Sequence, residues 1–265
     1  MVVLALDFMN MCHRARSGFT AGDHSVVFNF FRGFKALVEQ FKPSRVYVAL
    51  EGHPKHRHDA LPTYKAQRVS PPDAFFAQVS AIQLLLSAYF PVSVVHHPDY
   101  EGDDTIANLV MRSSTAIDWV VASSDSDFTQ LLTRPNIKLY NMVSKKFVAT
   151  NIPWYVGWKA LRGDASDNIP GFPGIGDKKA EVLIRDDAQL KAFLCDESKK
   201  ELFLRNLSLI EFANWDDKTA ASMTCSSPAR DWENVKHAFD SYGFTSITAP
   251  KYWDKFVGTF DPLFG

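Results

Sequence analysis

Short apolar runs alternate with longer amphipathic segments through the first half of the chain, and this alternation constrains the fold more than any other feature. The short runs have the length of buried strands, and the longer segments carry apolar residues at helical spacing. The expected strands are 2–6, 45–50, 92–96, 119–122 and 137–140, and the expected helices are 25–41, 73–89 and 103–114. The pattern predicts an α/β fold with a largely parallel central sheet flanked by helices.

Strand-like runs stop at about Asn151, and the remaining sequence favours helices joined by Gly/Pro turns. We therefore expect an α/β core over residues 1–150 and a helical C-terminal region over 151–265. With 265 residues, of which 46% are hydrophobic, the chain can bury a substantial core, which excludes a disordered protein.

The N-terminal segment and the cysteines indicate the compartment. Residues 1–7 contain no basic leader and reach a charge at Asp7, so we expect neither a signal peptide nor a membrane span there. Cys12, Cys195 and Cys225 form no disulfide pattern and no metal-ligand pair, which is typical of a reducing compartment. These features predict a cytoplasmic protein without a membrane partner.

Five acidic clusters occur at or near the ends of predicted elements, where an open α/β sheet usually places its active site. They comprise Asp7; Glu51; Glu101, Asp103 and Asp104; Asp125 and Asp127; and Asp164 and Asp167. Any single cluster is explained better by helix capping or by solvated surface acids than by a metal site. Nine carboxylates at one sheet edge, however, repel each other unless protons or hard cations compensate them.

Oxygen ligands favour Mg²⁺ or Mn²⁺. Two such ions, roughly 4 Å apart, can orient a water and stabilise the leaving oxygen of a displacement at phosphorus. The formal net charge is −1, but removing these nine acids from the 30 Asp and Glu leaves 21 against 29 Lys and Arg, a remainder of +8. The rest of the protein is therefore basic, which favours a polyanionic substrate.

Residues 52–71 are rich in basic side chains and show little apolar periodicity. We interpret this stretch as a solvated basic loop or mobile helix, although an ordinary exposed connection explains it equally well. His53, His56 and His58 lack a cysteine or a fourth ligand, which argues against zinc.

Residues 163–180 carry a different signal, in which Gly174 and Gly176 form a tight turn before a helix that begins near Lys178. Backbone N–H groups at such a helix start can hold a phosphate without reading any base.

These motifs together resemble the 5′ nuclease family, which includes bacteriophage flap endonucleases and the 5′–3′ exonuclease portion of bacterial DNA polymerases. The resemblance covers almost the whole chain, and residues 202–207 look most like the phage members. It rests on residues 7–10, 57–58, 64–68, 101–104, 125–131 and 163–180. The resemblance implies a flap endonuclease and 5′–3′ exonuclease acting in DNA replication or repair, with a short basic helical arch at 52–71 and a helix hairpin at 163–180 that binds DNA.

The resemblance also implies roles for individual residues. The first metal cluster would comprise Asp7, Glu51, Glu101, Asp103 and Asp104, with Asp104 bridging as a catalytic residue, and the second would comprise Asp125, Asp127, Asp164 and Asp167. Lys65 and Arg68 would meet the scissile phosphate at the base of the arch, with Tyr64 stacking on a terminal base. Further DNA-binding positions would be Arg14, Lys159, Gly174, Gly176, Lys178 and Lys179.

The resemblance further implies two or three divalent ions and a K⁺ ion held by backbone carbonyls of the hairpin. The expected partner is branched or 5′-ended DNA, with RNA–DNA hybrids as a further substrate, and the protein is expected to be a monomer. Two features depart from the family: Glu51 stands where an Asp is usual, and the arch is short because Pro71 and Pro72 soon follow Arg68.

Three other functions stay open from the residues alone. A haloacid-type phosphatase would use Asp7 as nucleophile but needs a second acid at position 9, which is Met9. A ribonuclease of a related small fold would share the carboxylates without needing residues 163–180. A catalytically silent binder of branched DNA would keep the basic surface and lose the acidic set, which is complete here.

Overall fold

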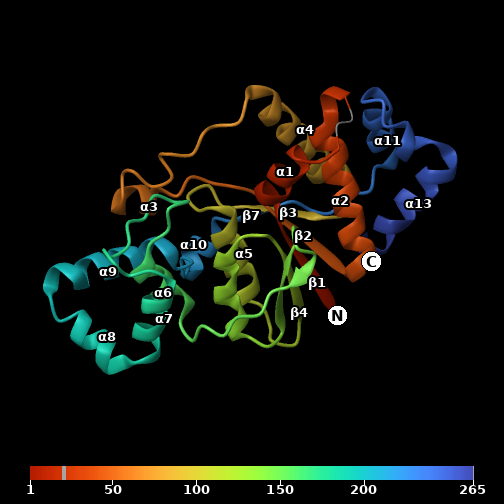
Figure 1. Ribbon diagram of the computed structural model, residues 1–265. Helices are drawn as coiled ribbons and strands as arrows, with labels where there is room; N and C mark the ends of the chain where they lie inside the picture. The colour runs from red at the N-terminus through yellow and green to blue at the C-terminus, as the bar shows by residue number, and fades with distance from the viewer. Residues whose placement is uncertain (20–21, 265) are drawn as a thin grey trace.

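Helices and strands occupy most of the computed structural model, which describes residues 1–19 and 22–264 (Figure 1). Their bounds are β1 Val2–Asp7, α1 Phe8–Arg16, η1 Gly22–His24, α2 Ser25–Phe41, β2 Arg45–Ala49, α3 Lys55–Ala60, α4 Asp73–Tyr89, β3 Ser93–His96, α5 Gly102–Met111, β4 Asp118–Ala122, η2 Ser126–Thr133, β5 Ile137–Asn141, β6 Lys146–Phe147, α6 Tyr155–Arg162, α7 Asp177–Arg185, α8 Asp187–Phe193, α9 Glu197–Ile210, α10 Asp217–Ala221, β7 Thr224–Cys225, α11 Trp232–Ser241, α12 Thr245–Thr248, α13 Pro250–Phe260 and η3 Asp261–Phe264, where η marks a 3₁₀ helix.

The predicted strands all form, and they make one sheet in the order β6-β5-β4-β1-β2-β3-β7. Strands β1 to β5 pair in parallel, whereas β6 and β7 add antiparallel edges. The expectation that strands stop after Asn151 is wrong at β7, which pairs with β3. Two residues are too few to show the strand period that sequence analysis detects.

Alternate residues of β1 face opposite layers, as the pleat of a strand requires. Leu4 and Leu6 pack into one core with helices α1, α2 and α4, whereas Val3 and Ala5 pack into a second core with α5 and η2. The α/β class with helices on both faces of a mostly parallel sheet is therefore confirmed. Helices α2 and α4 have the bounds that their apolar spacing predicts.

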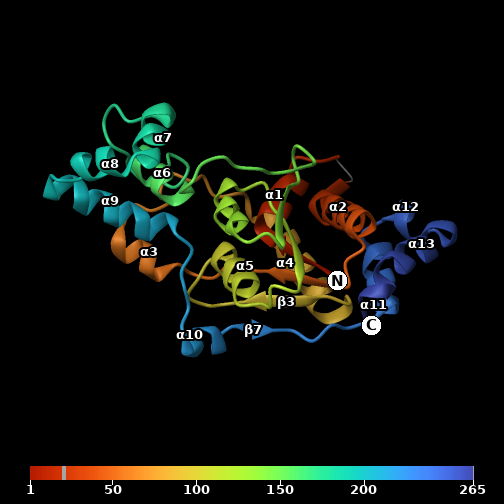
Figure 2. The ribbon, with the colours of Figure 1, turned by 90° about the horizontal axis from the view of Figure 1, so that it is seen from below.

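The region after the expected boundary near residue 150 consists of two parts that pack in different cores. Residues 155–210 form a helical unit with its own core, in which α6 packs against α7 and α9. Helices α11, α12 and α13 instead rejoin the first core, where they contact each other, α2 and α4. Figure 2 shows these two parts at opposite ends of the molecule. The helical spacing of apolar residues does not distinguish the two parts, because it shows that a helix has an apolar face but not which core that face packs against.

Within the part of the chain that the structure describes, no helix combines the length and the apolar character that crossing a membrane requires.

Candidate metal and nucleic-acid site

The site lies at the carboxyl edge of the parallel strands, where β1 pairs with β2 on one side and with β4 on the other. The strand order reverses between β1 and β4, because β2 and β3 follow on one side of β1 whereas β4 and β5 lie on its other side. Open α/β sheets bind ligands at such a topological switch point. Asp7 ends β1, and its Oδ2 accepts a 2.7 Å hydrogen bond from the Ser123 hydroxyl, just after β4. Ser123 also accepts a 3.0 Å bond from the backbone N–H of Asp125. One serine therefore joins two acidic clusters that lie far apart in the sequence.

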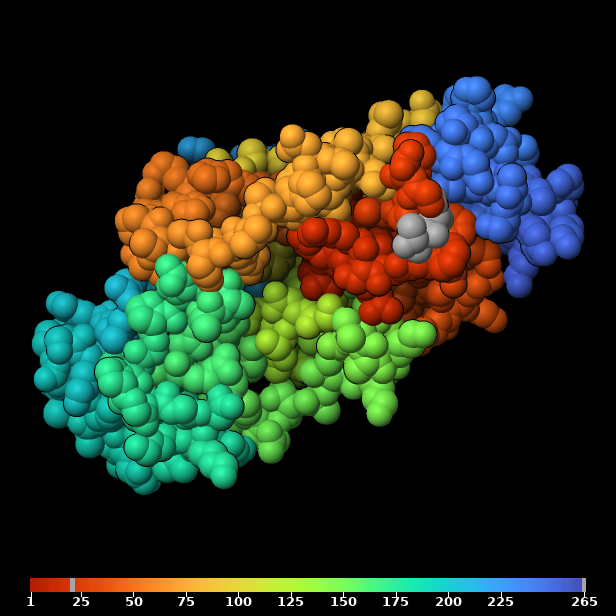
Figure 3. Space-filling view, turned by 45° about the horizontal axis from the view of Figure 1, so that its top comes forward, coloured from red at the N-terminus to blue at the C-terminus, as the bar shows by residue number. Residues whose placement is uncertain are grey.

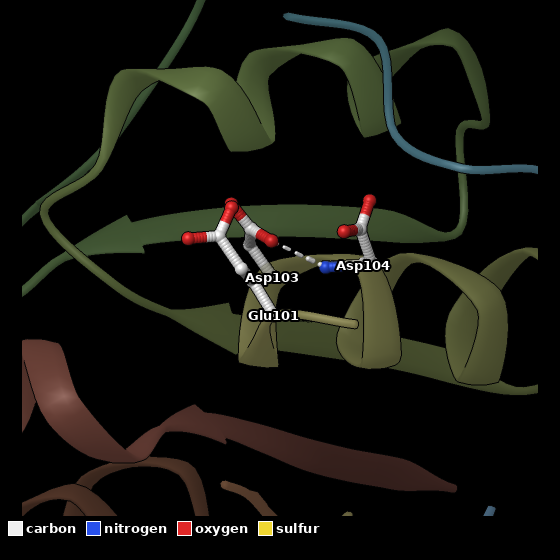
Figure 4. A group of neighbouring side chains, drawn as sticks. All are labelled: Glu101, Asp103 and Asp104. Atoms are coloured by element: carbon white, nitrogen blue, oxygen red, sulfur yellow. Dashed lines mark hydrogen bonds between the residues drawn. The ribbon is translucent and has the colours of Figure 1, made fainter. Parts of the chain in front are cut away.

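The first carboxylate group comprises Glu101, Asp103 and Asp104 at the N-terminus of α5, with oxygens within 4.8 Å of one another. In Figure 4 the carboxylates of Glu101 and Asp103 lie together, whereas that of Asp104 lies to one side. The backbone N–H of Asp104 donates to Asp103 Oδ1 at 2.6 Å. Gly102 places its N–H within 2.9 Å of Glu51 Oε2, which brings the end of β2 to the same helix start.

Arg57 is a site residue to which the sequence analysis assigned no role. Its side chain is 2% exposed and contacts both Glu101 and Asp104, the latter at 2.9 Å from Nη2 to Oδ1. Its Nε donates to the carbonyl of Leu209 at the end of α9. The interpretation of 52–71 as solvated is therefore wrong at Arg57, because three carboxylates compensate the buried guanidinium. The spacing of Arg57, Leu61 and Tyr64, typical of one helical face, was the available signal.

Asp104 is the most deeply buried acid of the first group, and the bridging role that the resemblance implies for it stays a prediction. Its side chain is fully buried, and its Oδ1 accepts hydrogen bonds from Arg57 and from the backbone N–H of Ala213. Successive residues of a helix point about 100° apart. Asp104 therefore points to the segment after α9, whereas Glu101 contacts the residues that lead to the second group.

The second carboxylate group comprises Asp127, Asp164 and Asp167, again with oxygens within 4.8 Å of one another. The Lys159 ammonium contacts Asp127 and lies 2.6 Å from Asp164 Oδ2. Lys159 is 4% exposed, so its expected role as a DNA-facing cation is not what the structure shows. Lys159 points inward from α6, and the carboxylates of Asp127 and Asp164 compensate its buried charge.

Tyr64 and Lys65 connect the two groups. Lys65 Nζ lies 2.6 Å from Glu101 and 3.8 Å from Asp167, while the Tyr64 hydroxyl lies 3.0 and 3.3 Å from the same residues. Arg68 is more exposed and donates to Asp167 at 2.5 Å. The expected stacking of Tyr64 on a base does not fit this position, because its ring is 3% exposed and packs in the core of the helical unit.

Asp7, Glu51 and Asp125 lie outside both groups among the residues described. Glu51 borders the first group through the N–H of Gly102, and Asp125 borders the second because it accepts a 2.9 Å hydrogen bond from the backbone N–H of Asp127. Ser123 joins Asp7 to Asp125. The structure thus brings six of the nine predicted ligands into two tight groups and places the other three at their margin.

Burial and neighbouring charges shift the pKa values of these acids in opposite directions. Burial raises the pKa of Asp7 and that of Asp127 to about 6, although Lys159 opposes the shift at Asp127. At Glu101 burial acts in the same direction, but Lys65 and Arg57 outweigh it and hold its pKa below the ordinary value. Hydrogen bonds from Lys159 and Ser166 likewise lower the pKa of Asp164 despite its burial. The cations of the protein therefore compensate the negative charge of these carboxylates only in part.

The segment 163–180 forms the turn between helices α6 and α7. Gly171 lies so close to the Arg162 carbonyl that a Cβ there would be 1.9 Å from its oxygen, and Gly174 adopts φ +75°, so both positions require glycine. Gly176 caps α7, and Lys178 and Lys179 are exposed in its first turn. Neither lysine forms an ion pair within the described ranges, and Arg14 on α1 is likewise exposed and unpaired.

Figure 3 shows a hollow bordered by the orange segment around the arch, the green segment around α6 and the red segment around α1. All-oxygen groups of three carboxylates fit hard divalent cations. The arrangement can therefore hold metal ions beside a cationic surface.

Comparison with known proteins agrees with this geometry. Residues 3–153 match the model of the 5′–3′ exonuclease N-terminal resolvase-like domain. The chain is 32% identical over 185 residues to DNA polymerase I of Caldicellulosiruptor bescii, which covers 63% of this chain and 21% of the relative. It is 31% identical over 196 residues to that of Bacillus caldotenax, covering 67% and 22%. The chain thus spans about one fifth of the length of these relatives.

Solved structures share the fold over nearly the whole chain. The bacteriophage T5 D15 flap endonuclease, in a complex with DNA and metal ions, superposes with a TM-score of 0.63 at 18% identity and covers 99% of each chain. The catalytic core of Rad2 with a DNA substrate has a TM-score of 0.59 at 15% identity, covering 98% of this chain and 91% of its own.

Proposed function

The chain belongs to the 5′–3′ exonuclease family, and from that membership we propose that it is a structure-specific 5′ nuclease that hydrolyses phosphodiester bonds in DNA. The observation that carries the proposal is the pair of carboxylate groups at the sheet edge, joined by Tyr64 and Lys65. Two such groups beside a free cationic surface suit a phosphodiester substrate. The T5 protein, described as a flap endonuclease with bound DNA and metal ions, supports flap and exonuclease activity in replication or repair.

Divalent metal ions belong to this proposal. Glu101, Asp103 and Asp104 would hold one ion and Asp127, Asp164 and Asp167 another, with Asp7, Glu51 and Asp125 at the margin. Bound Mg²⁺ or Mn²⁺ activates a water and stabilises the leaving oxygen of the displacement. A third ion, and K⁺ held by carbonyls of the turn 163–176, are further parts of the proposal.

The cationic residues have separate tasks in this proposal. Lys65 and Arg68 bind the phosphate, because both lie beside Asp167 and their side chains remain 21% and 54% exposed. Arg57 is a positioning residue that holds Glu101 and Asp104 from behind and never meets the substrate. Lys159 compensates Asp127 and Asp164 in the same way.

The DNA partner follows from the exposed cations. Lys178 and Lys179 on α7 would hold downstream duplex by its phosphates, together with backbone N–H groups near Gly174 and Gly176. We extend the proposal to RNA–DNA hybrids, to a monomer and to the cytoplasm, which suits the three free cysteines at positions 12, 195 and 225.

The decisive experiment uses end-labelled 5′ flap, nicked duplex and single-stranded DNA, each with Mg²⁺ and with EDTA. We expect cleavage that needs Mg²⁺ and that is fastest on the flap. Asp164→Asn should abolish cleavage and spare binding in a gel-shift assay without metal, because it removes a ligand oxygen and lessens repulsion toward DNA. Asp254→Asn on α13, an exposed acid away from the site, is the matched control and should cleave normally. Equal cleavage in EDTA, or equal cleavage of flap and single strand, would contradict the proposal.

A further inference from the structure

The hydroxyl of Tyr155 lies beside the second carboxylate group. Tyr155 begins helix α6, and its hydroxyl oxygen lies 3.1 Å from Asp127 Oδ1 and 3.0 Å from Ser126 Oγ. A second donor on the same helix reaches the same carboxylate oxygen, because Lys159 Nζ also contacts Asp127 Oδ1. The two donors are four residues apart, so they lie on one face of α6. This face of the helix is therefore turned toward the metal site.

The direction of these hydrogen bonds follows from the chemistry of the groups. An ionised carboxylate only accepts hydrogen bonds, whereas a phenol has a single proton to donate. The Tyr155 proton therefore goes to Asp127 Oδ1, and Ser126, which has a hydroxyl proton of its own, donates to the Tyr155 oxygen. Ser126 and Tyr155 thus form a chain of donors that ends on one carboxylate oxygen.

The same two donors leave the second oxygen of Asp127 available. Within the described part of the chain, no hydrogen-bond donor contacts Asp127 Oδ2. Lys159 has a flexible side chain whose ammonium also lies 2.6 Å from Asp164 Oδ2, so it holds Asp127 less rigidly than a ring can. The Tyr155 ring packs beside Trp158, with 5.7 Å between the ring centroids. Tyr155 is therefore the donor that fixes which oxygen of Asp127 faces the group.

The orientation of Asp127 matters because its group is suited to a divalent ion. Asp127, Asp164 and Asp167 each bring one carboxylate oxygen within 4.8 Å of the others. A hydrogen bond to the far side of a metal ligand orients that ligand toward the ion. Loss of such a partner typically lowers metal affinity or activity by about 10- to 100-fold.

We propose that Tyr155 is a positioning residue, which together with Lys159 holds Asp127 Oδ1 so that Oδ2 faces a divalent ion in the second carboxylate group. Its task is to set the affinity of that group for the ion, and it takes no part in the displacement at phosphorus. This inference rests on the proposed function, and it adds to the nine carboxylates a neutral side chain that controls metal binding.

The test uses Tyr155→Phe, which removes the hydroxyl and keeps the ring. Electron paramagnetic resonance of free Mn²⁺ measures metal binding to the protein without DNA, and Asp164→Asn identifies the binding that belongs to the second group. We expect Tyr155→Phe to weaken that binding by about ten-fold or more and to leave the remaining Mn²⁺ binding unchanged. The Mg²⁺ concentration that gives half-maximal single-turnover cleavage of a flap substrate should rise by a similar factor, and saturating Mg²⁺ should restore the rate.

Two further variants sharpen this test. Ser126→Ala should weaken Mn²⁺ binding less than Tyr155→Phe does, and combining the two should cause no further loss, because Ser126 acts through the Tyr155 hydroxyl. Tyr140→Phe is the matched control, since it removes a hydroxyl that donates to Gln40 Oε1 at 3.1 Å, outside both carboxylate groups. It should leave Mn²⁺ binding unchanged.

The proposal is overturned if Tyr155→Phe binds Mn²⁺ as tightly as the intact protein, or if Tyr140→Phe loses as much affinity. A loss of rate that saturating Mg²⁺ does not restore would also overturn it, because such a loss indicates a packing role. The proposed nuclease function fails separately. If the intact protein binds Mn²⁺ but cuts no flap substrate, that function is contradicted, whereas weaker Mn²⁺ binding by Tyr155→Phe would still support the role of Tyr155.

Discussion

Lys65 carries a positive charge at the point where the two carboxylate groups meet. In the transition state, charge develops on the phosphate oxygens, and a preorganised cation there contributes several kcal/mol. Lys65→Ala should therefore reduce single-turnover cleavage by roughly a hundredfold or more, with a much smaller change in substrate affinity. The measurement is the rate at saturating enzyme over labelled flap substrate.

Arg68 provides an internal comparison for Lys65. Its side chain is 54% exposed and contacts only the second group, so Arg68→Ala should show the same pattern more weakly. A loss of affinity with an intact saturated rate would place both residues among the DNA-binding positions instead.

Arg57 is a buried cation on which three carboxylates depend. Removing one member of a buried ion pair typically costs about 3–5 kcal/mol, because the partner charge is left uncompensated. We expect Arg57→Ala to lower the free energy of unfolding in urea by about that amount in EDTA. Saturating Mg²⁺ should recover part of the loss, since it compensates the same carboxylates. A loss below about 1 kcal/mol, or one that Mg²⁺ leaves unchanged, would contradict the role assigned to Arg57.

Asp7 predicts a pH dependence of stability. Its pKa of about 6 in the folded protein exceeds the unfolded value of 3.8, so the folded state binds the proton more tightly and is destabilised by this group as the pH rises through 6. Asp7→Asn removes this destabilising contribution of the Asp7 carboxylate. In EDTA, the stability of the variant relative to the original protein should rise by on the order of 1 kcal/mol between pH 5 and pH 7.5. The substitution also removes the Asp7 charge that, after burial, raises the pKa of Glu51, and this second change acts in the same direction. A constant or falling difference would be inconsistent with a raised pKa at Asp7.

The turn into α7 contributes to DNA binding and not to the chemical step. Lys178→Ala and Lys179→Ala should weaken DNA binding about equally on all sequences, because phosphate contacts carry no base information. The dependence of log affinity on log salt should become shallower by up to about one unit for each lost contact. Lys191→Ala on α8, another exposed lysine, is the control. An unchanged salt slope would place these lysines off the DNA path.

Helices α11, α12 and α13 complete the first hydrophobic core, which supports the site. Phe260 on α13 is fully buried, with its ring centroid 5.1 Å from that of Phe34 and 5.2 Å from that of Phe90. Phe260→Ala should lower the free energy of unfolding by about 3–5 kcal/mol. At a temperature where the variant is folded, cleavage per folded molecule should stay unchanged, because α13 packs against α2 at the end of the molecule opposite to α6 and α7 (Figure 2). Tyr252→Ala, which truncates an exposed ring on the same helix, should change stability little.

Local sequence patterns determined the elements and the residue types of the site. Apolar periods of two and 3.6 are properties of neighbouring residues, so helices α2 and α4 and the parallel strands follow from the sequence itself. The acids at strand ends follow too, because parallel strands bring their carboxyl ends to one edge. The pattern could not specify which core α11 and α13 join, because an apolar helical face fits any apolar partner.

Only the tertiary structure decided how charges are shared within the site. Arg57, Lys159 and Tyr64 look like surface residues in the sequence, yet all three are buried against carboxylates. Apart from Asp164, which follows Lys159 closely in the sequence, their carboxylate partners lie between 32 and 103 positions away along the chain. Burial of a charged group depends on whether compensating charges reach it in three dimensions, and no local pattern records that distance. The sequence by itself therefore determined which carboxylates gather at the sheet edge, and the folded chain decided which cations they hold.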